Sequence, residues 1–240
     1  MRSILIAGLG LIGGSAGKAL RRRGWRVLYF DPFVGDAGDA ADERAESLDA
    51  PADLVLLATP VNVAIEHLRG LRTLATSACS VMRPLRAIGN ESFVAGHPMA
   101  GSDERGIAAA RADLFEGKPW FLDAEHPLVD ELIRDCGAVR QRVTAEEHDA
   151  GVALTSHLPQ VLSTAVAAYL DDHDVLRFAG SGLKTFLRLA GSDASVWAPV
   201  IEANRDQLAP HAEGVARIVS EILNGDSEAF AKAQRLRGRL

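Results

Sequence analysis

Near its amino end the chain reads SILIAGLGLIGG, residues 3–14. Five residues that suit a buried strand run directly into a Gly-x-Gly-x-x-Gly spacing, formed by Gly8, Gly10 and Gly13. Between a strand and a helix this spacing is typical of a dinucleotide-binding turn. The first glycine permits the tight turn, the second lets the backbone approach a pyrophosphate, and the third lets helix and strand pack closely. A tight strand-to-helix turn without a ligand is the alternative interpretation.

Other residues fit the same cofactor. Asp31 closes the second candidate strand, where its carboxylate would accept hydrogen bonds from the adenosine ribose and so favour NAD. A 2′-phosphate there would meet like charge, and no arginine directly follows Asp31, although NADP is not excluded. Asp31 could instead serve a turn or a cap. Backbone N–H groups of Leu11 and Ile12 would face the pyrophosphate, and the loop at Thr59 and Pro60 would pass under the nicotinamide.

Strand and helix signals alternate through the first part of the chain. The candidate strands are residues 3–7, 26–30, 54–58, 77–81, 93–96 and 119–122. This alternation predicts an α/β fold with a Rossmann-type, doubly wound parallel sheet. From Thr144 onward the strand signals disappear and helix formers dominate. We therefore expect a dinucleotide-binding domain over residues 1–143 and an all-helical substrate and dimerisation domain over residues 144–240.

The second part predicts three helical stretches. The first covers 145–170, and Thr144 followed by Glu147 is a capping-box signal for its start. The second covers 193–223 with an interruption at Pro210, and the third covers 227–236. A helical domain of fewer than 100 residues is too small to bury all its apolar helix faces by itself, so a homodimer through this part is expected.

Bulk composition narrows the function classes. The chain has 240 residues, 48% of them hydrophobic, and a formal net charge of −6. Its basic residues are scattered, which argues against nucleic acid or an anionic membrane as a partner. The apolar run 3–12 is too short to cross a bilayer. The cysteines Cys79 and Cys136 lie far apart, which predicts neither a disulfide framework nor a metal site, and a cytoplasmic protein fits best.

A histidine loop carries the strongest chemical signal. Residues 96–102 read GHPMAGS, which places His97 between two glycines at the carboxyl end of a candidate strand. Open α/β sheets bind ligands at such loops. An imidazole there could accept a proton from a substrate hydroxyl while hydride leaves the same carbon. A structural role for this histidine is the alternative.

Five motifs in order resemble the prephenate/arogenate (cyclohexadienyl) dehydrogenase family. They are residues 8–15, 96–102 with Gly106, the Glu-His-Asp at 147–149, the Ser-His-Leu-Pro at 156–159, and Arg-Leu-Ala at 188–190 with Ser192, Asp193 and Trp197. The resemblance spans nearly the whole chain. It implies oxidative decarboxylation of prephenate to 4-hydroxyphenylpyruvate, of arogenate to tyrosine, or of both, with hydride transfer to NAD in tyrosine biosynthesis.

The resemblance also implies roles for single residues. His97 matches the catalytic histidine that hydrogen-bonds the ring hydroxyl, and Ser80 matches a serine that assists at that hydroxyl and at the nicotinamide. Arg188 matches the arginine that binds a substrate carboxylate. Asp103 and His148 match an acidic residue and a histidine near the site entrance, linked to Arg188.

Alternatives stay open for the residues of the second domain. His157 matches a histidine at the core of the substrate-domain helix, and a satisfied core histidine is its alternative. His148 could be a solvent-facing helix residue. Arg188 lies in an apolar stretch, where a buried guanidinium needs an anionic partner; an ion pair within the domain or with a dimer-mate is the alternative.

Gln160 stands where members selective for prephenate often have a second histidine, as in members that take arogenate or both acids. Its amide could serve a keto acid through N–H or an ammonium group through C=O, so the preferred acid stays open.

Two rival functions remain. A β-hydroxyacid dehydrogenase or imine reductase could share the architecture. The former typically uses a lysine on a helix of its second domain as the catalytic acid, and Lys184 is a better placed candidate for this role than Lys232. A module that binds NAD without turnover is the second rival. Reduction of NAD by prephenate or arogenate would separate all three.

Overall fold

The computed structural model describes residues 1–102 and 104–239, which form two compact units. The first unit contains Met1–Gly151 and Ser192–Ala203. The second contains Val152–Gly191 and the described residues from Asn204 onward. The helical part predicted from residue 144 therefore contributes α5 (Ala145–Val152) and α8 (Ala194–Ala203) largely to the first unit.

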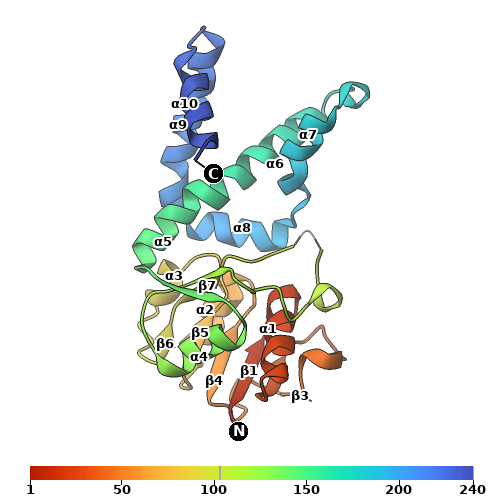
Figure 1. The fold of residues 1–240 in the computed structure, drawn as a ribbon, viewed down its shortest axis with the longest axis vertical. Helices are drawn as coiled ribbons and strands as arrows, with labels where there is room; N and C mark the ends of the chain where they lie inside the picture. Colours follow the sequence, from red (N-terminus) through yellow and green to blue (C-terminus); the bar gives the residue numbers. More distant parts are fainter. Residues whose placement is uncertain (103, 240) are drawn as a thin grey trace. The chain divides into compact units, whose positions relative to one another are not determined.

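A parallel sheet forms the centre of the first unit, in the order β3-β2-β1-β4-β5-β6 (Figure 1). Its strands are β1 (Ser3–Ala7), β2 (Arg26–Phe30), β3 (Glu43–Arg44), β4 (Leu54–Leu57), β5 (Ala75–Ser77) and β6 (Phe93–Val94). All five strand pairs are parallel. The chain moves outward from β1 to β3 and then returns to the other side of β1, so the strand order reverses between β1 and β4. A doubly wound sheet binds its ligand at the carboxyl ends of the strands beside such a switch point. The predicted fold class is confirmed.

Both faces of this sheet are covered. Ile4 and Ile6 pack into one core with α1 (Leu11–Arg22) and α4 (Pro127–Asp135). Leu5 and Ala7 pack into another core, with α2 (Val61–Gly70) and α3 (Arg83–Arg86) on the opposite face. Successive side chains of a strand point to opposite faces, so a sheet buried on both needs continuous apolar runs such as that of β1.

A second sheet carries the histidine loop. It contains β7 (Gly96–Pro98), β8 (Pro119–Leu122) and β9 (Val139–Arg142); β7 is antiparallel to β8, and β8 is parallel to β9. The prediction of one strand over 93–96 was wrong, because the chain changes sheets at Ala95. The Ala95 N–H donates to Asp123 Oδ1 (2.8 Å) and its C=O accepts from the Asp123 N–H (3.1 Å).

The strand predicted over 77–81 was also misplaced. β5 covers Ala75–Ser77, and its last ladder bond runs from the Ala78 N–H to the Leu57 C=O. The next residues form a loop into α3. Val81 and Met82 are buried as the apolar pattern required, but they pack at the start of a helix.

Short elements complete the first unit. They are the 3₁₀ turns η1 (Gly38–Ala40) and η2 (Ile107–Ala109). The helix α8 packs Val200 against Val61 and Val81, which fixes this late segment on the first unit.

The second unit is entirely helical among its described residues. Its elements are the π-helical turn η3 (Ala153–His157), α6 (Leu158–Asp171), η4 (Leu176–Phe178), α7 (Ser181–Phe186), η5 (Leu187–Gly191), α9 (Arg205–Leu223) and α10 (Glu228–Arg237). Within residues 1–102 and 104–239, no helix combines the length and apolar character needed to cross a bilayer.

The helix predictions were partly right. The capping box is confirmed, since the Thr144 N–H donates to Glu147 Oε2 (3.0 Å) and the Glu147 N–H donates to Thr144 Oγ1 (3.1 Å). The interruption expected at Pro210 was wrong. Pro210 lies inside α9, and the break comes at Asn204, whose backbone is not helical (φ −121°, ψ 20°).

Candidate active site

The glycine-rich turn joins β1 to α1. Gly8 has a φ of +89°, which favours glycine, and a Cβ on Gly13 would lie 1.9 Å from the Gly8 carbonyl oxygen. The fold itself requires these two glycines. A Cβ on Gly10, in contrast, would meet no described protein atom within 4 Å. The space over Gly10 is therefore open to a ligand, as the close approach of a pyrophosphate demands.

The start of α1 faces the same space with backbone donors. Gly10 is its N-cap, and no side chain caps the helix. The first N–H groups of a helix, here those of Leu11 and Ile12, have no acceptor within the helix. With the partial positive charge of the helix start they form a ready anion site. The residues present thus fit a dinucleotide pyrophosphate.

Asp31 lies directly after β2 and next to the glycine turn. Its Oδ2 accepts from the Leu9 N–H (2.8 Å), and its Oδ1 accepts from the N–H groups of Phe33 (2.8 Å) and Val34 (3.1 Å). The turn role considered above is therefore present in the structure. Two carboxylate oxygens offer about four acceptor positions, so a ribose hydroxyl can still bind. Arg44 on β3 also reaches this place, with Nη2 3.4 Å from the Asp31 C=O.

Thr59 and Pro60 form the loop from β4 to α2, and Pro60 is the N-cap of α2. Thr59 lies beside the glycine turn, with its Cγ2 2.9 Å from the Cβ position of Gly8. Thr59 Oγ1 is buried and has no hydrogen-bond partner among the described residues. The Thr59 C=O accepts from the Cys79 thiol (3.6 Å), and burial raises the pKa of that thiol to about 12, so it stays protonated.

His97 lies on β7, opposite Phe121 of β8. The Ser77 hydroxyl at the end of β5 holds this strand in place. It donates to the Gly96 C=O (2.9 Å) and accepts from the Gly96 N–H (3.2 Å). The backbone on the amino side of His97 is thereby fixed to the parallel sheet.

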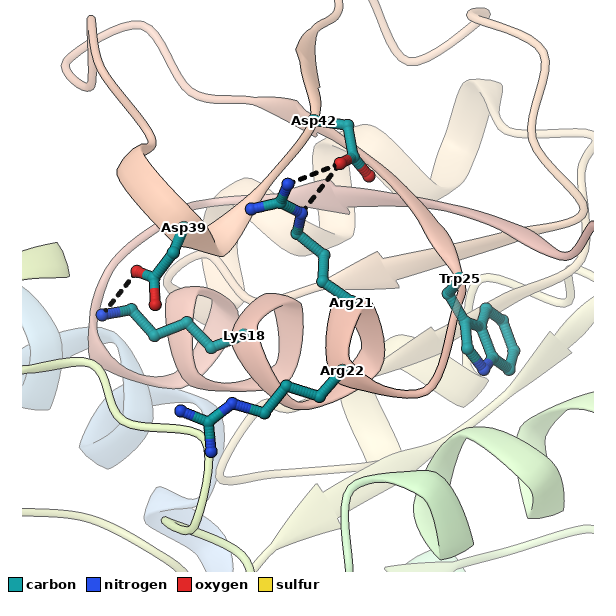
Figure 2. Close-up of a pocket in the computed structure, with 6 residues that line it drawn as sticks. All are labelled: Lys18, Arg21, Arg22, Trp25, Asp39 and Asp42. Carbon is teal, nitrogen blue, oxygen red and sulfur yellow. Dashed lines mark hydrogen bonds and ion pairs between the residues drawn. The ribbon is translucent and has the colours of Figure 1, made fainter.

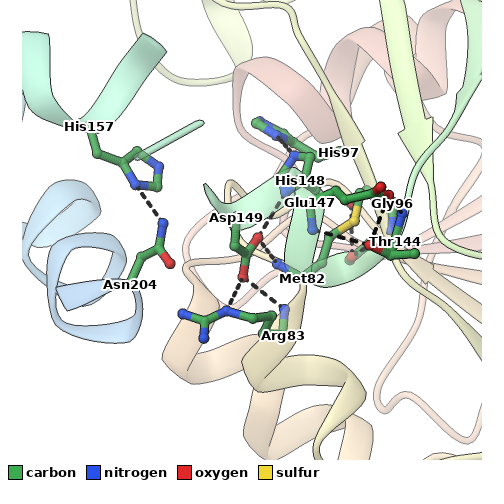
Figure 3. A network of polar contacts seen from close by, with 11 residues as sticks. Met82, Arg83, Gly96, His97, Thr144, Glu147, His148, Asp149, His157 and Asn204 are labelled. Carbon is green, nitrogen blue, oxygen red and sulfur yellow. Dashed lines mark hydrogen bonds and ion pairs between the residues drawn. The ribbon is translucent and has the colours of Figure 1, made fainter. Parts of the chain in front are cut away.

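A chain of hydrogen bonds extends from His97 into the protein (Figure 3). His97 Nδ1 lies 2.9 Å from His148 Nε2, and His148 Nδ1 lies 2.8 Å from Asp149 Oδ1. His97 is half-buried, whereas His148 is 3% exposed and Asp149 is fully buried. We call these three residues the His–His–Asp chain. His148 is thus a buried residue that contacts His97, and the solvent-facing alternative is wrong.

The acceptors at the buried end assign the ring protons. Both Asp149 oxygens accept from backbone N–H groups, so Oδ1 also accepts from His148 Nδ1, which carries the proton; with that ring neutral, His148 Nε2 is an acceptor. His97 must then donate from Nδ1, which leaves its Nε2 as a proton acceptor. The chain therefore favours the tautomer of His97 in which Nε2 is unprotonated and can accept a proton.

Asp149 also anchors the loop that contains Ser80. Its Oδ1 accepts from the Met82 N–H (2.8 Å) and its Oδ2 from the Arg83 N–H (2.9 Å), with Arg83 Nε at 3.4 Å (Figure 3). Ser80 is half-buried on this loop, two residues before Met82. One carboxylate therefore orients the histidine pair and holds the start of α3.

The candidate residues of the second unit lie on η3, α6 and η5. His157 is fully buried, and its Nδ1 accepts from Asn204 Nδ2 (3.2 Å) (Figure 3). Gln160 is 4% exposed and donates to the Leu189 C=O (2.9 Å). These side chains hold helices together within the unit.

Arg188 lies on η5 and is exposed. The expectation of a buried guanidinium in an apolar stretch was wrong, because η5 is a short surface turn. Asp103 lies outside the described residues. Lys184, the acid expected of a β-hydroxyacid dehydrogenase, is exposed on α7.

A hollow in the first unit lies beside the carboxyl half of α1 (Figure 2). Its lining residues are Lys18, Arg21, Arg22, Trp25, Asp39 and Asp42. Ion pairs join Lys18 to Asp39 (2.9 Å) and Arg21 to Asp42 (2.8 Å), so much of its charge is already compensated. The glycine turn is at the other end of α1, and none of the sequence-predicted site residues lines this hollow.

Sequence reasoning missed several residues of the site. Ser77 carries a polar side chain in a buried strand, a weak signal for a structural hydrogen bond. Asp149 was part of a quoted motif, but no role followed from its spacing. The contact of Arg44 with Asp31 could not be predicted, because β3 has only two residues and so gives no strand pattern in the sequence.

Comparison with known proteins identifies both parts of the chain. Residues 16–140 match the family model described as the nucleotide-binding domain of prephenate dehydrogenase, and residues 144–235 match the model of its dimerization domain. A probable prephenate dehydrogenase, NovF, of Streptomyces niveus is 34% identical over 252 residues, covering 93% of this chain and 68% of that protein. A cyclohexadienyl dehydrogenase of Zymomonas mobilis is 28% identical and covers 87% of this chain and 83% of that protein.

A solved structure agrees with these matches. The prephenate dehydrogenase of Aquifex aeolicus, determined with hydroxyphenyl propionate and NAD⁺, superposes with a TM-score of 0.86 at 26% identity, covering 100% of this chain and 97% of that chain. The resemblance found in the motifs is confirmed, and the chain belongs to the prephenate dehydrogenase family.

Proposed function

We propose that this chain oxidatively decarboxylates prephenate, arogenate or both, with hydride transfer to NAD, as a step of tyrosine formation. Family membership supports the class of reaction. The observation that carries the proposal for this chain is the His–His–Asp chain, whose contacts favour the tautomer of His97 with Nε2 as the proton acceptor.

In the proposed reaction, His97 Nε2 accepts the proton of the ring hydroxyl as hydride leaves the carbon that bears it. The bond from the ring to its carboxylate breaks, its electrons enter the ring, and carbon dioxide departs. The phenolate that forms regains a proton from His97, so no net proton is released in this step. The nicotinamide, when bound, supplies the hydride acceptor. Because aromatisation drives the reaction, the protein mainly orients the reactants and moves one proton.

The remaining substrate contacts are proposals of the same kind. Arg188 would bind a carboxylate of the acid, because the planar guanidinium offers paired N–H donors that match the two carboxylate oxygens. Ser80 would assist at the ring hydroxyl. Asp103, His148 and His157 would support substrate binding, with His148 acting through His97.

NAD is the cofactor that the first unit favours. The glycine turn and the start of α1 would hold the pyrophosphate, Asp31 the ribose, and Thr59 and Pro60 the nicotinamide side. The guanidinium of Arg44 adds a positive charge near Asp31, which makes some use of NADP compatible with the carboxylate.

A homodimer through the helical part is also proposed, with functional domains at 1–143 and 144–240. The second unit exposes many large apolar side chains, which a partner surface would cover. They include Tyr169, Leu176, Phe178, Phe186, Leu223 and Phe230. Light scattering after gel filtration would give twice the monomer mass of 25.6 kDa, and a monomer at micromolar concentration would contradict the dimer.

One assay tests the function. Purified protein is incubated with each acid and with NAD or NADP, and absorbance of the reduced cofactor is followed together with the aromatic product. We expect reduction of NAD with equimolar product from at least one acid. Cofactor binding without reduction by either acid would overturn the proposal.

A further inference from the structure

Two buried side chains of α6 hold the turn that carries Arg188. Gln160 Nε2 donates to the Leu189 C=O (2.9 Å), and Ser163 Oγ donates to the Phe186 C=O (2.9 Å). The donors are three residues apart and so share one face of the helix. Their acceptors lie on either side of Arg188. Gln160 is 4% exposed and Ser163 is 1% exposed, so both bonds are shielded from water.

The acceptor carbonyls lie where the α-helical bonding pattern ends. Phe186 is the last residue of α7, and Leu189 lies in the short η5 turn. Carbonyls at the end of a helix are satisfied by side chains, by water or by the tighter bonds of a 3₁₀ turn. Side chains of α6 donate to both carbonyls here, which ties the backbone around Arg188 to a longer helix.

The Gln160 amide is committed to this contact. Its Nε2 donates to Thr164 Oγ1 (3.1 Å) as well as to the Leu189 C=O, which uses both N–H bonds. A flipped amide would set its oxygen against the Leu189 oxygen, so the hydrogen bonds fix its orientation. Donation to a keto acid would require breaking these bonds.

We infer that Gln160 and Ser163 form a clamp on the Arg188 turn, and that Gln160 is a positioning residue that does not itself select between the two acids. The inference rests on the proposed carboxylate-binding role of Arg188. A clamped turn holds the guanidinium near its binding position before the substrate arrives, which lowers the entropic cost of binding. Both acids share the carboxylates, so the clamp serves both equally.

The test compares Gln160→Met and Ser163→Ala with the parent enzyme. Each removes one clamp bond, and we expect KM to rise about fivefold for both acids, the equivalent of one hydrogen bond, with little change in kcat. The ratio of kcat/KM between the acids should change less than about twofold, the scatter of such measurements. Thr185→Ala is the matched control, because its hydroxyl bonds to the Ser181 C=O within α7 and leaves the clamp intact.

Two further readouts separate positioning from general loosening. Amide hydrogen exchange at residues 187–191 should accelerate in both clamp variants and not in the control. In an Arg188→Met background, Gln160→Met should raise KM no further. A changed preference between the acids with unaltered exchange at 187–191 would overturn the clamp. If the parent enzyme turns over neither acid, the proposed function fails, whereas the exchange measurement still tests the clamp.

Discussion

The glycine turn after β1 and the His–His–Asp chain place their functional groups by different means. The turn acts through backbone N–H groups, and its key residues carry no side chain. The His–His–Asp chain acts through side chains from β7 and α5, and its two histidines are 51 residues apart in the sequence. The proposed cofactor binding thus depends on local chain geometry, whereas the proposed proton transfer depends on tertiary packing. Substitutions should separate the two.

The largest effect is expected at the exposed end of the His–His–Asp chain. His97→Asn removes the proposed base and should lower kcat on the order of a hundredfold or more, the usual size of general-base catalysis. Affinity for NAD, measured by calorimetry, should stay unchanged because the glycine turn is untouched. Turnover within a few-fold of the parent would remove His97 from this role.

A substitution at the buried end of the His–His–Asp chain should lower kcat less than His97→Asn does, but still measurably. Asp149→Asn no longer holds His148 in the required tautomer, and kcat should fall on the order of 10- to 100-fold, as when outer partners of functional histidines are removed. Thr144→Ala is the control, since it removes the capping box of α5 at a cost of about 1 kcal/mol and leaves the ring contacts intact. Equal losses of kcat in the two variants would mean that α5 stability, and not the ring proton, is responsible.

Two glycines of the turn should respond in opposite ways. Gly13→Ala places a methyl group against the Gly8 oxygen and should lower the free energy of unfolding by about 2 kcal/mol or more. Gly10→Ala meets open space and should change stability by less than about 0.5 kcal/mol, yet raise KM for NAD about tenfold. Thermal unfolding and kinetics measure the two effects. Normal NAD affinity in Gly10→Ala would place the cofactor elsewhere.

The smallest effect concerns the adenosine end. Arg44→Ala removes the guanidinium near Asp31 and should lower kcat/KM for NADP about fivefold, since a charge pair at 4 Å contributes about 1 kcal/mol in water. The value for NAD should change little. The effect should shrink at high salt, because Arg44 is exposed. An equal fall for both cofactors would point to a structural role for Arg44.

The same contrast explains what the sequence could predict. The strands β1, β2 and β8 agree with the predicted bounds to the residue, and the glycine turn follows β1 as expected. Each depends on a local pattern. The change of sheets at Ala95 depends on Asp123, 28 residues away, and no local pattern indicates it. The helix break at Asn204 accompanies a hydrogen bond from Asn204 to His157, and the sequence analysis placed this break at Pro210 instead.

The candidate site divides in the same way. Gly10, Asp31 and His97 could be predicted as site residues because each lies at the carboxyl end of a candidate strand, where a sheet of this type binds ligands. The bond between His97 and His148, and the grip of Asp149 on the loop after Ser80, arise only when distant segments pack together. The exposure of Arg188 could not be read from its apolar neighbours, because η5 is a surface turn.

The ring tautomers of the two histidines test the central claim most directly. Nitrogen-15 NMR of the imidazoles, assigned with His97→Asn and His148→Asn variants, reports which nitrogen carries the proton when both rings are neutral. The His–His–Asp chain predicts protonated Nδ1 and unprotonated Nε2 on both rings, so that His97 Nε2 can accept the hydroxyl proton. A proton on His97 Nε2, with Nδ1 unprotonated, would contradict it.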